Sequence, residues 1–227
     1  MATVTDLIGP AGPLEAILDL PPGFDGPETE AAIRAAAVFA HPHPQFGGTM
    51  HTKAVYQGAK GLTRIGCAVL RFNFRGVGRS AGTFDEGQGE KADFAAALEY
   101  MAARYPGVKL WAAGFSFGSW VALEVGAADD RVSVLIGISP PVVTSVSGQD
   151  YQFPNTLAST KPKFFVQGEA DEVCPLEGMW QFYSQLPEPK ELVVIDAADH
   201  LYDGKTQEVG EALEELLRDF DEPVAPR

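Results

Sequence analysis

The chain has 227 residues, 45% of them hydrophobic, so it is long enough to form one large core. Its formal charge of −14 argues against nucleic acids and anionic membrane surfaces as partners, because no cluster of Lys and Arg could neutralise phosphates. No apolar run approaches the roughly 18 residues that a membrane span needs, and the N-terminus lacks the basic and apolar regions of a signal peptide.

Short apolar runs alternate with helical patterns from residue 35 to the end, after an early, partly exposed strand. This alternation is typical of βαβ units and predicts an α/β fold, with a mostly parallel central sheet and helices on both faces. Strands are expected over 14–20, 35–40, 67–74, 108–115, 132–138, 163–167 and 191–196. Helices are expected over 51–65, 90–105, 117–128, 175–186 and 206–220.

Two segments are left without a helix or strand. Residues 140–161 are polar and rich in Ser and Thr, and roughly twenty residues can form a flap but not a cap domain. Residues 221–227 are expected to be a frayed tail. Because no linker or internal repeat divides the chain, we expect a single domain over 1–227, either monomeric or homodimeric.

The cysteines and two of the histidines give no sign of a metal centre. Cys67 and Cys174 do not form a C-x-x-C pair, so we expect reduced thiols and a cytoplasmic protein. His41 and His43 are spaced to chelate a metal, but no third ligand accompanies them. We therefore expect no metal and no cofactor, and a structural role for His41 in ordering its loop.

One serine is flanked by glycines where a strand becomes a helix, in "KLWAAGFSFGSWVALEVG" (109–126). In such a strand–turn–helix, Gly114 and Gly118 leave room for a sharp turn that exposes the Ser116 hydroxyl at the carboxyl edge of the sheet. The following helix directs its first N–H groups toward the same point, where they would stabilise an oxyanion. The pattern predicts that Ser116 is a nucleophile.

A serine nucleophile needs a base, and the base needs an orienting acid. His200 alone among the four histidines follows Ser116 in the sequence, just after a buried strand. Asp171 lies in the loop after the preceding strand, while Asp196 and Asp199 are the rival acids. We expect the triad Ser116, Asp171 and His200.

The oxyanion hole requires two backbone N–H groups. That of Phe117 is the first candidate, because Phe117 directly follows the nucleophile. The loop "HPHPQF" (41–46) should supply the second. Its prolines carry no N–H, which leaves His43, Gln45 and Phe46 as candidates, with His43 favoured.

Taken together, the chain resembles the α/β-hydrolase superfamily. Within it, the chain is similar to a small cap-less bacterial group of serine esterases with "AVFAHPHPQFGGTMHTK", "VLRFNFRGVGRSAG", "AAGFSFGS", "QGEADEVCP" and "ADH". The resemblance covers the chain from about Gly9 to His200. It implies the α/β-hydrolase fold without a cap domain, and hydrolysis of esters.

The expected activity is that of a serine carboxylesterase acting on small, short-chain neutral esters through an acyl-enzyme. Phe46, Tyr151, Phe153 and Tyr202 are candidate substrate-binding residues. A thioesterase, a dienelactone-type lactonase or a peptidase could use the same triad, and a non-catalytic binding protein of the same fold is a further alternative.

Overall fold

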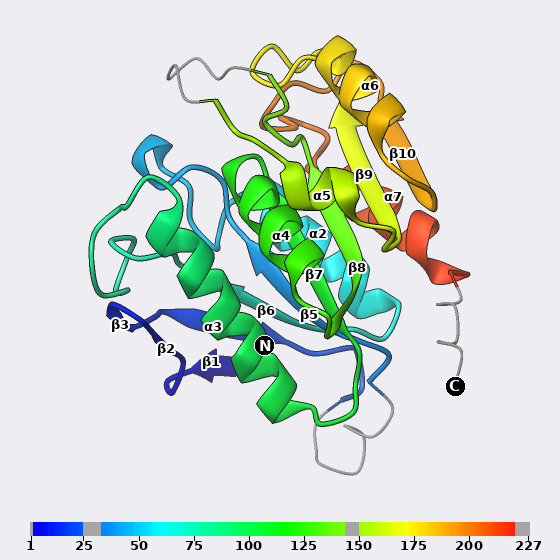
Figure 1. The fold of residues 1–227 in the computed structure, drawn as a ribbon. Helices are drawn as coiled ribbons and strands as arrows, with labels where there is room; N and C mark the ends of the chain where they lie inside the picture. The colour runs from blue at the N-terminus through cyan, green and yellow to red at the C-terminus, as the bar shows by residue number, and fades with distance from the viewer. Residues whose placement is uncertain (1, 25–32, 144–149, 221–227) are drawn as a thin grey trace.

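An eight-stranded sheet runs through the computed structural model, which describes residues 2–24, 33–143 and 150–220 (Figure 1). The strand order is β1-β4-β6-β5-β7-β8-β9-β10. The sheet strands are β1 (Ala2–Val4), β4 (Ala16–Asp19), β5 (Ala36–Ala40), β6 (Ala68–Phe72), β7 (Leu110–Phe115), β8 (Val132–Ile138), β9 (Lys163–Gly168) and β10 (Lys190–Ile195). The strands from β6 to β10 pair in parallel, while β4 pairs antiparallel with β6 and with β1.

The central strands are buried on both faces, which explains their continuous apolar sequences. In β5, one hydrophobic core contains Ala36, Val38 and Ala40. The alternate residues Ala37 and Phe39 belong to the core on the opposite face of the sheet. This alternation follows from the two-residue period of a strand. The sheet therefore separates two cores, and each of them needs a layer of helices.

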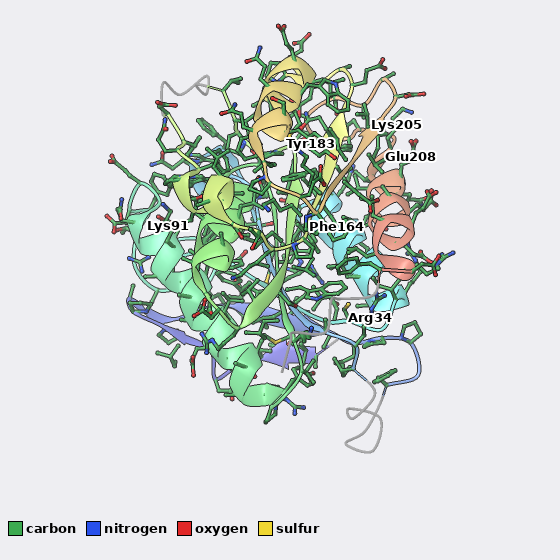
Figure 2. The ribbon with its side chains drawn as sticks, turned by 45° about the vertical axis from the view of Figure 1, so that its right-hand side comes forward. Arg34, Lys91, Phe164, Tyr183, Lys205 and Glu208 are labelled. Carbon is green, nitrogen blue, oxygen red and sulfur yellow. The ribbon has the colours of Figure 1, made fainter. Side chains whose placement is uncertain are left out.

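Helices cover both faces of the sheet. α3 and α4 cover one face together with α5 and α6, and α2 and α7 cover the other (Figure 1). Figure 2 shows the two layers from the side, with Lys91 on α3 and Glu208 on α7. The bounds are α2 (Lys53–Arg64), α3 (Gln88–Arg104), α4 (Phe117–Ala128), α5 (Pro154–Ala158), α6 (Leu176–Gln185) and α7 (Thr206–Arg218).

The predicted strands and helices after residue 35 are confirmed to within two residues at each end. Strand β1 and the small hairpin of β2 (Ile8–Gly9) and β3 (Gly12–Pro13) were not predicted from the sequence. These strands have two or three residues, too few to show a period. No helix or strand was expected over 140–161, and the described part of this stretch contains the helix α5. The predicted tail, 221–227, lies outside the described residues.

Two glycines inside the predicted helix 51–65 have a structural reason. A Cβ on Gly61 would lie 2.2 Å from the carbonyl oxygen of Gly210 in α7, and one on Gly58 would lie 2.9 Å from the Phe39 ring. The glycines let α2 approach α7 and the sheet closely. Their presence is therefore compatible with a stable helix, although glycine lowers helix propensity.

Candidate active site

Ser116 occupies a strained turn between β7 and α4. Its backbone has φ 54° and ψ −123°, a conformation that residues with a side chain rarely adopt. A Cβ on Gly114 would lie 2.2 Å from the Gly118 carbonyl oxygen, and one on Gly118 would lie 2.3 Å from the His41 carbonyl oxygen. Both flanking glycines are therefore required for the close approach of the helix to the neighbouring strands.

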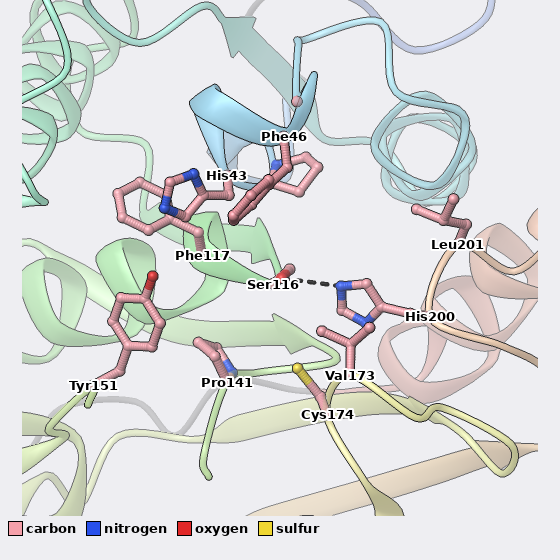
Figure 3. Close-up of a pocket in the computed structure, with 12 residues that line it drawn as sticks. His43, Phe46, Ser116, Phe117, Pro141, Tyr151, Val173, Cys174, His200 and Leu201 are labelled. Carbon is pink, nitrogen blue, oxygen red and sulfur yellow. Dashed lines mark hydrogen bonds between the residues drawn. The ribbon is translucent and has the colours of Figure 1, made fainter. Parts of the chain in front are cut away.

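The three predicted triad residues meet at the carboxyl edge of the sheet. Ser116 follows β7, Asp171 follows β9 and His200 follows β10. The His200 Nε2 atom lies 3.1 Å from Ser116 Oγ (Figure 3). The Nδ1 atom lies 2.9 Å and 3.1 Å from the two carboxylate oxygens of Asp171. This is an unbroken line of hydrogen bonds from acid through imidazole to hydroxyl.

The rival acids lie elsewhere. Asp199 is exposed, and its Oδ1 accepts a hydrogen bond of 2.9 Å from the backbone N–H of Asp203. Asp196 is exposed on the turn after β10. Among the described residues, Asp171 is therefore the carboxylate that orients His200.

Asp171 is held by hydrogen bonds from its own loop and from the end of β9. Its Oδ1 atom accepts hydrogen bonds from the backbone N–H groups of Val173 (3.0 Å) and Cys174 (2.7 Å). Its Oδ2 atom accepts one from the buried Gln167 Nε2, at 3.2 Å, and the same Nε2 donates to the Cys174 carbonyl at 2.7 Å. Gln167 and Cys174 were not predicted as site residues, although a Gln at the end of a predicted buried strand was a usable signal.

The loop after β5 presents His43 to the site. The N–H of Gln45 donates to His43 Nδ1 at 3.2 Å, and the N–H of Phe46 donates to the His43 carbonyl at 3.1 Å. The N–H groups of Gln45 and Phe46 therefore already have acceptors on His43, the N-cap of the short helix η1 (Pro44–Phe46). Of the three candidate donors, this leaves the N–H of His43 without an acceptor in the described part of the chain.

His41 is fully buried and neutral. The backbone N–H of Phe74 must donate to its Nε2 atom, at 3.1 Å, so its Nδ1 atom carries the proton and donates to the Pro42 carbonyl at 2.6 Å. Burial lowers the pKa of His41 to about 4. Both ring nitrogens are used to hold the loop, as the sequence analysis predicted for this residue.

A cavity of about 230 Å³ opens beside Ser116 (Figure 3). Among the described residues, no Asp, Glu, Lys or Arg lines the cavity, and its polar groups are the side chains of Ser116 and His200, the Cys174 thiol and the side chains of His43 and Tyr151. The lining residues are Pro42, His43, Phe46, Gly48, Ser116, Phe117, Pro141, Tyr151, Val173, Cys174, His200 and Leu201. The pocket is thus apolar and uncharged at its walls.

Two of the four predicted substrate-binding residues line this cavity and two do not. Phe46 and Tyr151 do, and Phe46 is 70% exposed at the mouth. The prediction for Phe153 was wrong, because its ring packs 4.8 Å from that of Phe182 in the core. It was also wrong for Tyr202, which is completely buried and hydrogen-bonded to Ser139 Oγ at 2.8 Å.

The expected flap is anchored to α4. The indole N–H of Trp120 donates to the Gln152 carbonyl at 2.9 Å. The buried Glu124 carboxylate accepts hydrogen bonds from the backbone N–H (2.9 Å) and the hydroxyl (2.7 Å) of Thr156 in α5. These contacts place Tyr151 against the pocket, where its pKa is raised to about 12 by burial.

The fold and the site define a serine hydrolase of the α/β class. Residues 34–224 match the family described as the alpha/beta hydrolase domain, and the chain belongs to this family. It is 34% identical over 209 residues to an uncharacterised protein of Rickettsia prowazekii, covering 86% of this chain and 87% of that one.

Solved structures agree with this assignment. An alpha-beta serine hydrolase homologue from Coxiella burnetii is 35% identical, with a TM-score of 0.83, over 95% of this chain and 97% of that one. A serine hydrolase without a lid from Xanthomonas campestris is also 35% identical, with a TM-score of 0.84, over 99% and 96% of the two chains. Among the described residues, no helix is both long enough and apolar enough to cross a lipid bilayer.

Proposed function

We propose that the protein is a serine carboxylesterase that hydrolyses small, short-chain neutral esters through an acyl-enzyme intermediate. The observation that carries the proposal is the line of hydrogen bonds from Asp171 through His200 to Ser116, which ends in an uncharged pocket. Such a line is the arrangement by which an imidazole removes the proton of a serine hydroxyl.

The reaction proceeds in two halves. Ser116 Oγ attacks the ester carbonyl carbon while His200 Nε2 accepts the hydroxyl proton, and His200 then gives this proton to the leaving alcohol. Water attacks the acyl-enzyme in the same way and releases the acid. Asp171 keeps the proton of the neutral ring on Nδ1, so that Nε2 is free to act as the base.

The tetrahedral intermediate carries a negative oxygen, which needs hydrogen-bond donors. The N–H of Phe117 lies at the first position of α4, where helical N–H groups have no acceptor within the helix. The N–H of His43 is the second donor, since those of Gln45 and Phe46 are already engaged. Removal of one such donor typically lowers kcat by about 10²–10³-fold.

The pocket size sets the expected substrate. An engineered apolar cavity of about 150 Å³ binds benzene, so a cavity of this size accommodates an acyl group of a few carbons or a single ring. An anionic acyl group would lose its hydration on entering the pocket and would find no cationic side chain there, which disfavours its binding. Both features favour small neutral esters.

The test is hydrolysis of p-nitrophenyl esters of increasing acyl length by the protein and by its Ser116→Ala variant. We expect kcat/KM to be highest for short acyl chains and to fall at least about 10⁴-fold in the variant, as in other triad enzymes. An unchanged rate in Ser116→Ala would overturn the proposal. Thioesters, lactones and peptides in the same panel rank the alternative acyl substrates.

A fluorophosphonate probe provides a second, substrate-independent test. It should label the protein and fail to label Ser116→Ala, because the probe reacts with an activated serine. Absence of labelling in both proteins would favour a non-catalytic binding protein.

A further inference from the structure

Three metal-ligating side chains converge at the edge of the pocket. Asp171, Cys174 and His200 each offer one ligand atom, and these atoms all lie within 4.8 Å of one another. The proposed hydrolysis uses the acid and the imidazole but assigns no part to the thiol. The Cys174 backbone N–H donates to the Asp171 carboxylate at 2.7 Å, so the same tight turn that holds the acid also brings the thiol beside it.

We propose that these three side chains form a binding site for a soft divalent cation of the Zn²⁺ class, and that an ion bound there inactivates the triad. The ion-binding part stands on the geometry alone, whereas the inactivation rests on the proposed function. Thiolate, imidazole and carboxylate are the ligands that Zn²⁺ prefers in proteins, and three protein ligands leave a fourth position open toward the pocket.

The side chains need to move little to bind an ion. With bonds of about 2.0–2.3 Å, the ligand atoms of a tetrahedral zinc site lie roughly 3.3–3.8 Å apart. The His200 ring and the Asp171 carboxylate, now 2.9 Å apart, must separate by about half an ångström on that geometry. The thiol must approach the other two ligands by about 1.5 Å at most, since the three ligand atoms now lie within 4.8 Å of one another.

The ion has a path to this site. Cys174 and His200 both line the cavity that opens beside Ser116. In Figure 3 the Cys174 sulfur points toward the space between Pro141 and the His200 ring. An ion entering the pocket therefore reaches the thiol and the imidazole without opening the hydrophobic core.

Ion binding would remove the base whichever ring nitrogen of His200 binds. The Cys174 thiol gives up its proton to solvent as the sulfur–metal bond forms. If Nε2 binds the ion, the lone pair that would accept the Ser116 proton is consumed. If Nδ1 binds, the single proton of the neutral ring moves to Nε2, which then has no lone pair for the serine proton.

The thiol is inert without a cation. Burial raises the pKa of Cys174, and the negative charge of Asp171 raises it further, so the group is a neutral thiol in the free protein. A bound divalent charge offsets both effects, because metal ligation deprotonates a coordinating thiol.

The two cysteines provide a matched pair of variants. Cys67 is fully buried in the core on the α2–α7 face and does not line the cavity. In Zn²⁺ we expect the wild type and Cys67→Ala to lose at least tenfold in ester hydrolysis, each relative to its own metal-free rate. Cys174→Ala should lose less than twofold, and Cys174→Ser serves in its place if the alanine variant does not fold. Equal inhibition of the Cys174 and Cys67 variants would overturn the proposal.

A direct binding measurement separates this proposal from the esterase proposal. In a Cd²⁺ titration, Cys67→Ala should develop the ultraviolet absorption of a cadmium–thiolate bond, and addition of His200→Ala to this variant should weaken cadmium binding at least tenfold. Cys174→Ala should show no such absorption. Absence of the band in Cys67→Ala would overturn the metal site even if esters are hydrolysed, and its presence would support the site even if they are not.

Discussion

The backbone at Ser116 is strained, and two glycines make the strain possible. We expect Gly118→Ala to lower the free energy of unfolding by about 2–3 kcal/mol, because its Cβ would lie 2.3 Å from the His41 carbonyl oxygen and must push the helix away from the loop. Hydrolysis should fall more than tenfold, since the nucleophile and the Phe117 N–H move with the helix. Urea unfolding and ester kinetics measure the two effects.

Gly107→Ala is the control for this change. Gly107 has φ +80°, and a Cβ added there would meet no atom within 4 Å. The substitution should therefore lower the free energy of unfolding by only about 1–2 kcal/mol, which is the cost of placing alanine in a left-handed backbone conformation. It should leave hydrolysis near the wild-type rate. A Gly118→Ala protein as active as Gly107→Ala would contradict the role assigned to this close approach.

His41 should make the stability of the protein sensitive to mild acid. Its pKa is 6.5 ordinarily and about 4 in the fold, where burial disfavours the charged ring. As the pH falls, the histidine of the unfolded chain is protonated at a higher pH than the buried ring of the folded protein. The free energy of unfolding should therefore decrease by about 3 kcal/mol between pH 6.5 and pH 4. In His41→Gln, whose amide can bond the same two partners without titrating, urea unfolding should depend less on pH over this interval. Equal pH dependence of both proteins would rule out His41 as the cause.

At the scale of elements, the contact between α2 and α7 depends on the absence of side chains. A Cβ on Gly61 would lie 2.2 Å from the Gly210 carbonyl oxygen, so Gly61→Ala must separate the two helices. We expect a loss of about 1–3 kcal/mol in the free energy of unfolding, which thermal denaturation would detect. Because the contact lies away from the pocket, kcat at a temperature where the variant is folded should stay within twofold. A wild-type melting temperature would contradict this account.

The sequence predicted the elements of the parallel sheet because each has a clear apolar pattern. It also predicted that Ser116, Asp171 and His200 meet, because all three follow strands and the carboxyl ends of parallel strands share one edge. It could not place Phe153 and Tyr202. A loop side chain can turn toward the pocket or the core, and this depends on partners such as Phe182 and Ser139, which are distant in the sequence.

At the scale of the whole molecule, the charge of −14 should discriminate between substrates of equal size. For an anionic ester such as p-nitrophenyl hemisuccinate, we expect kcat/KM to rise severalfold between low and high salt. The reason is that the Debye length falls from about 30 Å at 0.01 M to about 3 Å at 1 M. The neutral p-nitrophenyl butyrate should change less than twofold. A parallel response of the two esters would show that the field of the protein does not reach the site.

The strand order has a consequence for how the protein would lose its activity. His200 lies in the loop after β10, which is an edge strand of the sheet and is only half buried. Ser116 follows β7, a fully buried strand in the middle of the sheet. Edge strands unfold locally more readily than central strands, because fewer contacts hold them. Partial denaturation should therefore detach the base while the nucleophile's turn is still intact, and catalysis would disappear at a urea concentration below the one that unfolds the domain.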